Sequence, residues 1–443
     1  MKILYLSSFL PKRSETFVYN EVLGLESLGH DVGVASLYPP EKNLGDPALD
    51  RMAARAVPVY GSGQARLVRD ATAFFFRHPI RAIQVMTLAK MDALLADDIK
   101  LRDRPKVVFQ GLAGLALAQR IEARERGSLS EKPGGTGVPP VCGSDLRCEA
   151  PSPNGRDARS PCAENYTHLH VHMAHAAATV GMYAAHALGI PFSFTGHAAD
   201  LFRERCLLKQ KLRRAAFVAC ISEWHREWYR TIRRRPDADY PLIRCGVAVP
   251  VAALPPRSGP PLALLGLGRL VPKKGFDVLI EACRILAAEG IDLACVIAGD
   301  GPEMQRLKDL STGLPVTFPG EVANRDVPAL LARADLFVLP CRISGDGDRD
   351  GIPVVLMEAM AHGLCAVSGD LPTIRELIRD NQSGRLVPPG DPSALAACLR
   401  TLAGDPAHRA SLARSGRQRI EEEFSSAKNL DRLSIAFSAH HQP

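Results

Sequence analysis

The chain has 443 residues, more than one hydrophobic core usually fills, so two domains are expected. Apolar residues make up 46% and charged residues 23% of the sequence, and this ordinary globular composition excludes a largely disordered chain. The formal charge of +7 favours an anionic partner, such as a phosphate compound or an anionic lipid surface. No nucleic-acid-binding motif accompanies that charge, so no nucleic acid partner is expected.

The N-terminal segment MKILYLSSFLP begins like a signal peptide, with Lys2 before an apolar run. No small-residue cleavage site follows, and a helical pattern opens directly at Ser14, Glu15 and Thr16, so a buried first strand is expected instead. The 11 cysteines have no C-x-x-C spacing and many lie inside apolar runs, which is typical of reduced thiols. The sequence therefore predicts a cytoplasmic protein.

The first part of the chain alternates between strand and helix patterns. Residues 3–8 are expected to form a strand, residues 16–28 a helix, and residues 31–36 a second strand after the turn at Gly29 and His30. Such alternation predicts an α/β fold, with a parallel sheet that is covered by helices on both faces.

A helix is expected over residues 67–101, where Phe74, Phe75 and Phe76 are interleaved with the basic residues Arg69, Arg77, Arg81 and Lys90. A basic, aromatic-rich helix is able to lie on an anionic membrane surface. The favoured interpretation is that this helix packs on the sheet and keeps its polar face in solvent.

Residues 126–163 are rich in Gly, Pro, Ser, Arg and Asp and almost lack large apolar side chains. Because such a segment buries too little apolar surface to offset its ordering entropy, a disordered insertion is predicted, and its cysteines do not have the spacing of a zinc site. Residues 168–199 contain no Asp, Glu, Lys or Arg, but their histidines and the breaks at Gly189 and Pro191 favour strand, buried helix and strand over a membrane span.

A proline-rich stretch over residues 250–261 marks a boundary, after which the alternation restarts. The nearly continuous apolar runs that follow are typical of parallel strands covered on both faces. We therefore expect two Rossmann-like domains, 1–250 and 251–425, that face each other across a cleft, and a C-terminal helix over 426–443 that crosses back to the first domain. The strands expected after the boundary are 262–266, 293–298, 316–319 and 336–340, and the helices are 276–288, 302–310 and 327–334.

Basic residues follow the first strand of the second half, in the loop GRLVPKKG. This loop lies at the edge where open α/β sheets bind ligands. Arg269 is able to fork two phosphate oxygens while a lysine of the same loop supplies a mobile point charge, so a phosphate group would be held without a metal ion. The alternative is a solvated basic turn.

Two carboxylates occur in the segment DGDRDGIPVVLMEAMAHG, at Asp350 in a loop and at Glu358 about two helical turns later. The helix is expected to start near Pro353, and the glycine-rich loop before it leaves backbone amides free to receive a pyrophosphate. Both carboxylates would then face one cleft. An exposed acidic loop before a packed helix explains the segment equally well.

The second half resembles the donor-binding half of family 4 glycosyltransferases, which have the GT-B fold, through the motifs GRLVPKKGFDVLIEA, AGDGPE, FPGEV, ADLFVLPC, DGDRDGIPVVLMEAMAHG and GRLVPPGD. The first half resembles the acceptor half of bacterial exopolysaccharide and lipopolysaccharide members, through LPKRSETFVYNEVLGLESLGHDV, HLHVHMAH, GIPFSFTGHAADLF and ISEWHREW. These motifs cover nearly all of the chain except the insertion.

The resemblance implies retaining transfer of a sugar from a nucleotide diphosphate sugar to an acceptor hydroxyl, without a metal or other cofactor. It assigns Arg269 and Lys274 to the leaving pyrophosphate and Glu358 to the ribose hydroxyls. Asp350 takes the first acidic position, near the donor sugar, where the family usually has Glu. The remaining residues that it assigns to donor binding are Gly299, Gly301, Val322, Gly351 and Ile352.

On the acceptor side, the resemblance makes His197 an active-site histidine, and Asp200 either orients it or caps the next helix. His172 is placed at the border of the acceptor pocket. Ser14, Glu15 and Thr16 either bind the acceptor or start a helix with Ser14 as its N-cap. His168, His170 and His172 alternate along a strand as metal ligands would, but the cations and carboxylates already account for phosphate binding, so no metal is expected. Glu376 matches a family glutamate but lacks the preceding Gly-Ile-Pro.

The expected protein is a metal-independent glycosyltransferase that extends a surface polysaccharide, on a glycan or lipid-linked acceptor, in the cytoplasm or at the cytoplasmic face of the inner membrane. Two alternatives remain open. A nucleotide-sugar 2-epimerase shares the fold and the donor, and a non-catalytic subunit would bind the nucleotide sugar without turnover.

Overall fold

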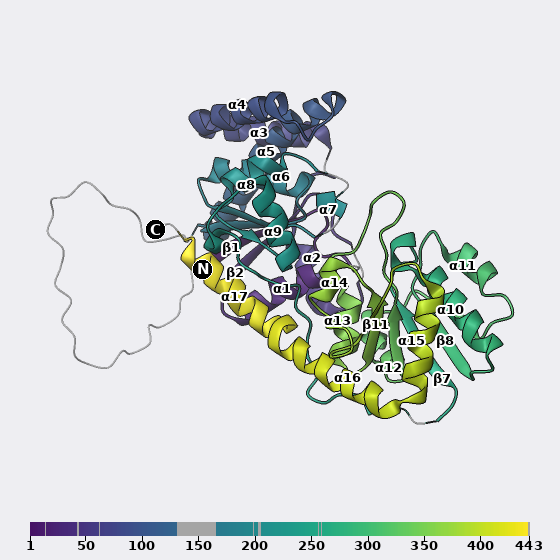
Figure 1. Cartoon of the computed structure of the whole chain (residues 1–443). Coiled ribbons are helices and arrows are strands. Elements are labelled where there is room, and N and C mark those ends of the chain that lie inside the picture. Colours follow the sequence, from purple (N-terminus) through teal and green to yellow (C-terminus); the bar gives the residue numbers. More distant parts are fainter. Residues whose placement is uncertain are drawn as a thin grey trace, which may run out of the picture.

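The computed structural model describes residues 1–441 except 14, 42–43, 62, 131–164, 198, 203–204, 256 and 258. Two α/β halves lie side by side, each built around a six-stranded parallel sheet (Figure 1). The strand orders are β3-β2-β1-β4-β5-β6 in the first half and β12-β11-β10-β7-β8-β9 in the second. The predicted pair of Rossmann-like domains is therefore confirmed.

The first sheet is covered on both faces, as the alternation predicted. Ile3 and Tyr5 of β1 pack toward one face, while Leu4 and Leu6 pack into the core on the other, because successive side chains of a strand point to opposite sides. Its strands are β1 (Lys2–Ser7), β2 (Asp31–Ser36), β3 (Val57–Pro58), β4 (His168–His172), β5 (Phe192–Thr195) and β6 (Val218–Ala219).

Helices of the first half match the predicted pattern near the N-terminus and differ from it over residues 67–101. The expected single helix is two helices, because Pro79 lacks an N–H and disfavours helical geometry at His78, whose φ is −132°. The helices are α1 (Thr16–Ser27), α2 (Pro47–Arg55), α3 (Gln64–Arg77), α4 (Pro79–Leu95), α5 (Arg104–Ser130), α6 (Ala176–Leu188), α7 (Ala199–Phe202), α8 (Leu208–Arg214) and α9 (Glu223–Ile232).

Two further predictions for this half are corrected. α3 and α4 lie on α5, in an outer layer, and not directly on the sheet (Figure 1). Residues 126–130, which were assigned to the insertion, complete α5, while residues 131–163 lie outside the described residues. The expected strand, buried helix and strand over residues 168–199 are confirmed as β4, α6 and β5. Among the described residues, no helix combines the length and the apolar character needed to cross a membrane.

The second half follows the predicted order of strands and helices closely. Phe276, Leu279 and Cys283 are buried on one stripe of the first helix, as the helical period requires. Its elements are β7 (Leu262–Leu267), α10 (Phe276–Ala288), β8 (Leu293–Ala298), α11 (Met304–Leu310), β9 (Val316–Gly320), α12 (Val327–Leu331), β10 (Leu336–Leu339), α13 (Val354–Ala361), β11 (Cys365–Gly369), α14 (Pro372–Arg375), β12 (Arg385–Val387), α15 (Pro392–Gly404) and α16 (Pro406–Arg419).

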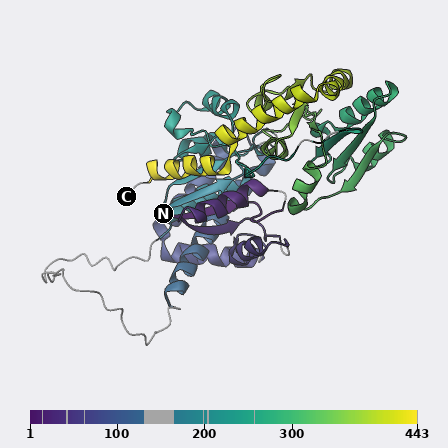
Figure 2. The same cartoon turned by 90° about the horizontal axis from the view of Figure 1, so that it is seen from below.

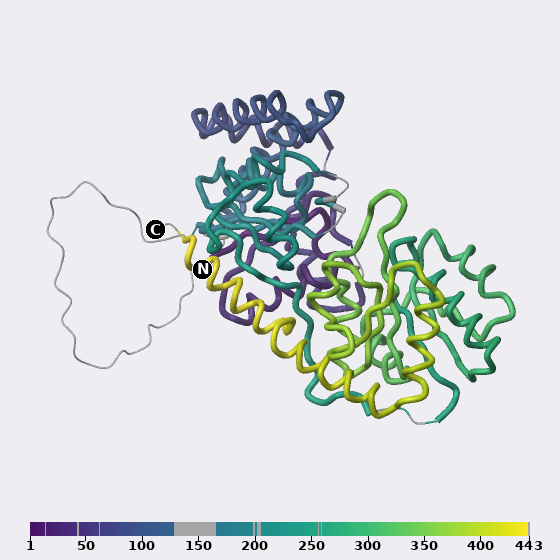
Figure 3. The backbone as a smooth tube through the Cα atoms, in the orientation of Figure 1, coloured from purple at the N-terminus to yellow at the C-terminus, as the bar shows by residue number. Residues whose placement is uncertain are grey.

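The last helix, α17 (Ser426–Ala439), returns from the second half to the first and lies along α1 (Figures 1 and 2). Leu433 and Phe437 are buried in the core on the α1 side of the first sheet. His30 Nε2 forms a hydrogen bond of 2.9 Å with Ser434 Oγ. The backbone trace in Figure 3 shows α16 and α17 following one another along both halves.

Candidate active site

The carboxyl ends of β4 and β5 place two histidines where the first half meets the second. His172 is the last residue of β4, and His197 follows β5 by two residues. A Cβ added to Gly351, in the loop before α13, would lie 3.3 Å from the backbone oxygen of His197. The glycine-rich loop of the second half therefore touches the first half at His197, with its backbone and without a side chain between them.

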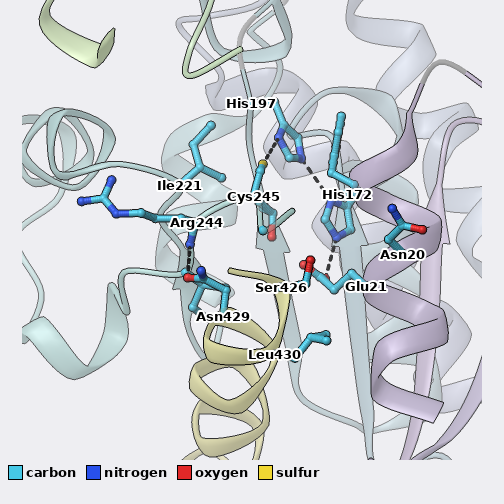
Figure 4. Close-up of a pocket in the computed structure, with 14 residues that line it drawn as sticks. Asn20, Glu21, His172, His197, Ile221, Arg244, Cys245, Ser426, Asn429 and Leu430 are labelled. Atoms are coloured by element: carbon cyan, nitrogen blue, oxygen red, sulfur yellow. Dashed lines mark hydrogen bonds and ion pairs between the residues drawn. The ribbon is translucent and has the colours of Figure 1, made fainter. Parts of the chain in front are cut away.

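A chain of hydrogen bonds runs from the sheet to His197 (Figure 4). Tyr5 donates to Glu21 Oε1 at 2.7 Å, and His172 Nε2 lies 2.8 Å from the same oxygen. His172 Nδ1 is 3.0 Å from His197 Nε2, and His197 Nδ1 is 3.8 Å from Cys245 Sγ. Because the Glu21 carboxylate accepts, Nε2 of His172 carries the proton, and its Nδ1 accepts from His197. His197 is left with an acceptor lone pair on Nδ1.

The charge state of His197 agrees with this direction of the hydrogen bonds. Burial lowers the pKa of His197 to about 3, and His172 lowers it further while Asp200 opposes the shift. His197 is therefore a neutral hydrogen-bonding group at neutral pH. Asp200 accepts from the backbone N–H groups of Ala174 at 2.7 Å and His197 at 3.1 Å, so it fixes the backbone of His197.

A pocket with an empty volume of about 410 Å³ opens next to these histidines, between the first half and α17 (Figure 4). Arg269, Lys274 and Glu358 are not among its lining residues. His172, which was predicted to border an acceptor pocket, is one of the residues that line this pocket. The lining residues are Phe17, Asn20, Glu21, His172, Thr195, His197, Ile221, Ile243, Arg244, Cys245, Gly246, Ser426, Asn429 and Leu430.

In the second half, Asp350 forms ion pairs with two lysines of the loop after β7. Its carboxylate lies 2.7 Å from Lys274 Nζ and 3.2 Å from Lys273 Nζ. Burial alone would raise the pKa of Asp350, but Lys274 and Lys273 outweigh it and lower that pKa. Burial likewise opposes the charge on Lys274, and Asp350 outweighs it, so the pKa of Lys274 is raised. Asp350 therefore orders the lysines of the loop after β7.

Arg269 extends from the same loop into solvent. Its side chain is exposed, and no hydrogen bond or ion pair joins it to another described residue. Lys274, by contrast, lies along Gly268, whose added Cβ would be 3.6 Å from Lys274 Cε. The two predicted phosphate ligands thus belong to one loop, with Lys274 held in place and Arg269 free to move toward an anion.

Glu358, in α13, is a half-buried carboxylate to which no described residue donates a hydrogen bond. Burial raises the pKa of Glu358 to about 7. It faces the first half, because after the effect of burial its charge also raises the pKa of Tyr19 in α1. The hydroxyl of Tyr19 accepts a hydrogen bond of 3.0 Å from Asn324 Nδ2, which joins the two halves beside this carboxylate. The two predicted carboxylates therefore have different surroundings.

The other residues predicted to bind the donor lie near this loop or in the core beneath it. A Cβ on Gly299 would be 2.0 Å from the oxygen of Gly268, so close approach of two loops requires glycine there, and Gly301 meets Leu270 in the same way. Val322 packs against the core after β9, and Ile352 is buried in it.

The predicted acceptor residues at the start of α1 are partly described. Ser14 lies outside the described residues, and the N-cap of α1 is Glu15, whose side chain makes no capping hydrogen bond. Thr16 is the first residue of the helix. One oxygen of Glu15 accepts from Lys12 at 2.9 Å, and the other is buried without a partner. The residue at the N-cap position of α1 is therefore Glu15.

Sequence reasoning missed Glu21 and left the role of Glu376 open. The Glu376 carboxylate accepts from the backbone N–H groups of Glu223 and Trp224, both at 2.8 Å, and from Arg244 at 2.8 Å. Glu376 therefore joins the second half to the N-terminus of α9. A signal for Glu21 was available, because it interrupts the apolar stripe of α1, and a carboxylate in such a place requires a partner.

One group among the described residues has metal-ligand spacing, namely Glu21, His170 and His172, whose ligand atoms lie within 4.8 Å of one another. Every ring nitrogen of the two histidines already has a hydrogen-bond partner. His170 bonds to Ser193 at 2.7 Å and to Thr195 at 3.0 Å. These contacts account for the alternating histidines of β4 as part of a polar network inside the sheet.

Known proteins resemble the chain at two levels. Residues 255–419 match the family described as glycosyl transferases group 1. The amylovoran biosynthesis glycosyltransferase AmsK of Erwinia amylovora is 42% identical over 168 residues, which are 37% of this chain and 41% of that protein. A GDP-mannose-dependent alpha-(1-6)-phosphatidylinositol monomannoside mannosyltransferase of Mycolicibacterium smegmatis is 35% identical over 156 residues, 34% of this chain and 41% of that protein. The matches span about two fifths of the length of these relatives.

Solved structures resemble the whole chain. HepE of Anabaena, in complex with UDP and glucose, superposes with a TM-score of 0.61 at 16% identity, over 99% of this chain and 100% of that one. The lipopolysaccharide outer core galactosyltransferase WaaB gives a TM-score of 0.60 at 14% identity, over 99% of each chain. At such low identities the likeness shows the fold. The chain therefore has the GT-B fold, and the part of it that is similar to glycosyl transferases group 1 is residues 255–419.

Proposed function

We propose that this protein is a retaining, metal-independent glycosyltransferase of family 4. It moves a sugar from a nucleotide diphosphate sugar to a hydroxyl of a glycan or lipid-linked saccharide, in the biosynthesis of a surface polysaccharide such as an exopolysaccharide or lipopolysaccharide. The reaction takes place in the cytoplasm. The observation that carries the proposal is Glu358, a half-buried carboxylate to which no described residue donates a hydrogen bond. It faces the first half and belongs to the same half as the cationic loop of Arg269 and Lys274.

The cationic loop supplies the phosphate end of the site. An ammonium group has three donors, so Lys274 is able to keep its ion pair with Asp350 and still donate to a phosphate oxygen. Arg269 is exposed and forks two oxygens when it turns toward them. As the bond between sugar and phosphate breaks, negative charge grows on the leaving pyrophosphate, and these cations stabilise it.

Glu358 supplies the nucleoside end. A carboxylate with two acceptor oxygens suits a pair of neighbouring ribose hydroxyls, and each such hydrogen bond is charge-assisted. The donors of the hydroxyls would relieve the cost of burying this charge, which is the cause of its raised pKa. The carboxylate, which is unpaired in the free protein, would therefore gain hydrogen-bond partners when the nucleotide sugar binds.

The acceptor side lies in the first half, at His197. Its Nδ1 carries a lone pair that the hydrogen bonds from Glu21 through His172 leave unprotonated, and the group that faces this lone pair in the free protein is the weakly donating thiol of Cys245, at 3.8 Å. That lone pair is suited to accept a hydrogen bond from an incoming hydroxyl and so to orient it. The pocket beside it, lined by His172, Arg244 and Asn429, offers polar groups for a sugar.

The relatives support a nucleotide sugar donor without selecting a nucleotide. One is named as GDP-mannose-dependent, whereas HepE was crystallised with UDP-glucose. AmsK is named for the biosynthesis of amylovoran, and its likeness supports a polysaccharide product here.

The test is an assay of the purified protein with UDP-, GDP- and ADP-sugars, with and without saccharide acceptors and with EDTA present. We expect hydrolysis or transfer from one donor, and a loss of about 100-fold or more in Arg269→Ala and Glu358→Ala. Arg325→Ala is the matched control, because Arg325 is an exposed arginine of the same half. Unchanged rates in both site variants would disprove the assignment, and conversion of the donor into its epimer without an acceptor would identify an epimerase.

A further inference from the structure

Large apolar side chains are concentrated on the outer surface of α3 and α4. Of fourteen large apolar side chains that the described residues expose, nine lie between Val68 and Leu101. Phe76, Ile80 and Leu95 are 79%, 73% and 71% exposed. The remaining six are Val68, Phe75, Ile83, Met91, Leu94 and Leu101. We call the surface of residues 64–95 the α3–α4 face.

Helix α4 has two apolar stripes on opposite sides. The buried stripe contains Ala82, Val85 and Ala89, on the side of α4 that packs in the core. The exposed stripe contains Ile80, Ile83, Met91 and Leu94, whose spacing of three, eight and three residues keeps them on one side of a helix with 3.6 residues per turn. Packing in the protein core accounts for the first stripe only. The second needs another apolar environment, because contiguous exposed apolar surface marks an interaction site.

The charge on the α3–α4 face has a single sign. The acidic residues of this range are Asp70 and Asp92, and both are buried. Asp70 pairs with Arg120 at 2.7 Å, and Asp92 accepts from Arg214 at 2.8 Å. The exposed charges are all positive and come from Arg66, Arg69, Arg77, Arg81 and Lys90. On a helical projection, Arg81 and Lys90 lie on the two sides of the exposed stripe of α4.

We propose that the α3–α4 face docks the protein on an anionic lipid surface. The apolar stripe would enter the boundary between head groups and acyl chains, and the flanking cations would contact anionic head groups. The position of the face fits this role, because α3 and α4 lie at the end of the first half that is remote from the second half (Figure 1). A membrane on this side leaves the meeting place of the two halves accessible.

A second copy of the chain is a weaker candidate for the occupant of this face. In a symmetric dimer the same patch meets itself, which would bring the five cations of one copy against the five of the other. Asp70 pairs with Arg66 and Arg69 and so offsets part of this charge, but no carboxylate of residues 64–95 is exposed to meet the cations of a second copy. An anionic bilayer supplies both the apolar phase and the opposite charge.

The test is co-sedimentation of the full-length protein with vesicles of phosphatidylcholine alone or with added phosphatidylglycerol. We expect binding to the anionic vesicles, weakening with added NaCl. The triple variant Ile80→Ser, Ile83→Ser and Leu94→Ser should bind these vesicles at least about tenfold more weakly than the wild type. The matched control removes exposed apolar side chains elsewhere, at Leu28, Val251 and Ile435, each changed to Ser, and should bind as the wild type does.

A double variant that removes two positive charges tests the electrostatic part of the proposal. Arg66→Gln with Lys90→Gln should bind anionic vesicles more weakly and show a smaller effect of salt, whereas Arg284→Gln with Lys308→Gln should not. The thermal unfolding midpoint of each variant checks that it folds. Equal binding of the apolar variant and the wild type, or equal binding to neutral and anionic vesicles, would overturn the proposal. A dimer that the apolar variant abolishes, without vesicle binding, would overturn it in favour of self-association.

Discussion

His172 Nδ1 and His197 Nε2 lie 3.0 Å apart, so the acceptor atom of one imidazole is set by the proton on the other. The direction of this pair is decided at Glu21, in a different helix, whose carboxylate accepts from the far nitrogen of His172. Glu21 lines the same pocket but forms its hydrogen bond with His172 and not with His197, so it determines from one residue away which nitrogen of His197 accepts from a ligand.

Glu21→Gln should reverse that direction. An amide is able to donate to His172 Nε2, which would place the proton on Nδ1 of His172 and turn Nδ1 of His197 into a donor. We expect kcat for transfer to fall about 100-fold while donor affinity stays unchanged, because the donor loop is in the other half. Steady-state kinetics with titration calorimetry check this.

Glu26→Gln is the control for that experiment, because Glu26 belongs to the same helix but pairs with Arg55. A Glu21→Gln enzyme with unchanged kcat would show that the histidine pair serves only to satisfy buried polar groups.

Glu358→Gln should stabilise the protein at alkaline pH and weaken donor binding. The folded pKa of about 7 is above the ordinary value of 4.5, so the charged form is disfavoured by the fold. The resulting cost is absent below pH 4.5, grows as the pH rises to 7, and reaches about 3 kcal/mol above it. Urea unfolding at pH 8 and pH 5 should show a stabilised variant only at pH 8. Equal stabilities at both pH values would contradict the assignment of a strained carboxylate.

Donor affinity should depend on pH through the same group. Only the ionised carboxylate presents both oxygens as acceptors, so the wild type should bind its nucleotide sugar more weakly as the pH falls from 8 to 6, by up to about tenfold per unit below the pKa. Glu358→Gln should bind weakly at every pH in this range. A wild-type affinity that does not change between pH 8 and pH 6 would contradict a role for Glu358 in ribose binding.

Asp350→Asn should show whether Asp350 orders the lysines or binds the donor sugar directly. Removing the charge leaves Lys274 without its partner in a partly buried loop, while Lys273 keeps its ion pair with Asp348, and this should cost about 3 kcal/mol of stability. Because Lys274 is then free for phosphate, binding of the nucleoside diphosphate should be unchanged or tighter. Calorimetry with the free diphosphate checks this, and weaker binding would show that Asp350 serves the donor directly. Asp391, which caps α15, offers a control at Asp391→Asn.

Glu376→Ala should loosen the contact between the halves. It removes the acceptor of two backbone N–H groups and leaves the buried side chain of Arg244 unpaired, which should cost about 3 kcal/mol or more. We expect a larger radius of gyration in solution scattering and a higher KM. Asp370→Ala, which breaks a surface pair with Arg375, should change neither. An unchanged radius of gyration would mean that α17 alone sets the distance between the halves.

The fold could be predicted from the sequence because most of the parallel strands carry an apolar run and most of the boundaries carry a glycine or proline, although β4, with three histidines, has neither feature. The failures have local physical causes. The break at Pro79 was hidden inside a continuous helical pattern, and apolar residues of α4 that looked like core face outward, since periodicity shows that a stripe exists but not what covers it.

The site was predictable only as a set of residue types. Arg269, Lys274, Glu358 and His197 were all named from motifs, but their partners were not, because an ion pair such as Lys274 with Asp350 joins residues 76 positions apart. Glu21 and Glu376 act on residues more than 100 positions away, and no spacing rule links such groups before the chain has folded.

The return of α17 to the first half also sets an order for folding. Leu433 and Phe437 complete a core whose other members, such as Ile3 and Val22, belong to the first residues of the chain. A ribosome makes those early residues first and α17 only after the whole second half. The first half therefore emerges with an apolar groove beside α1 that stays open throughout synthesis of the second half, and a chaperone that shields this groove would favour correct assembly over aggregation.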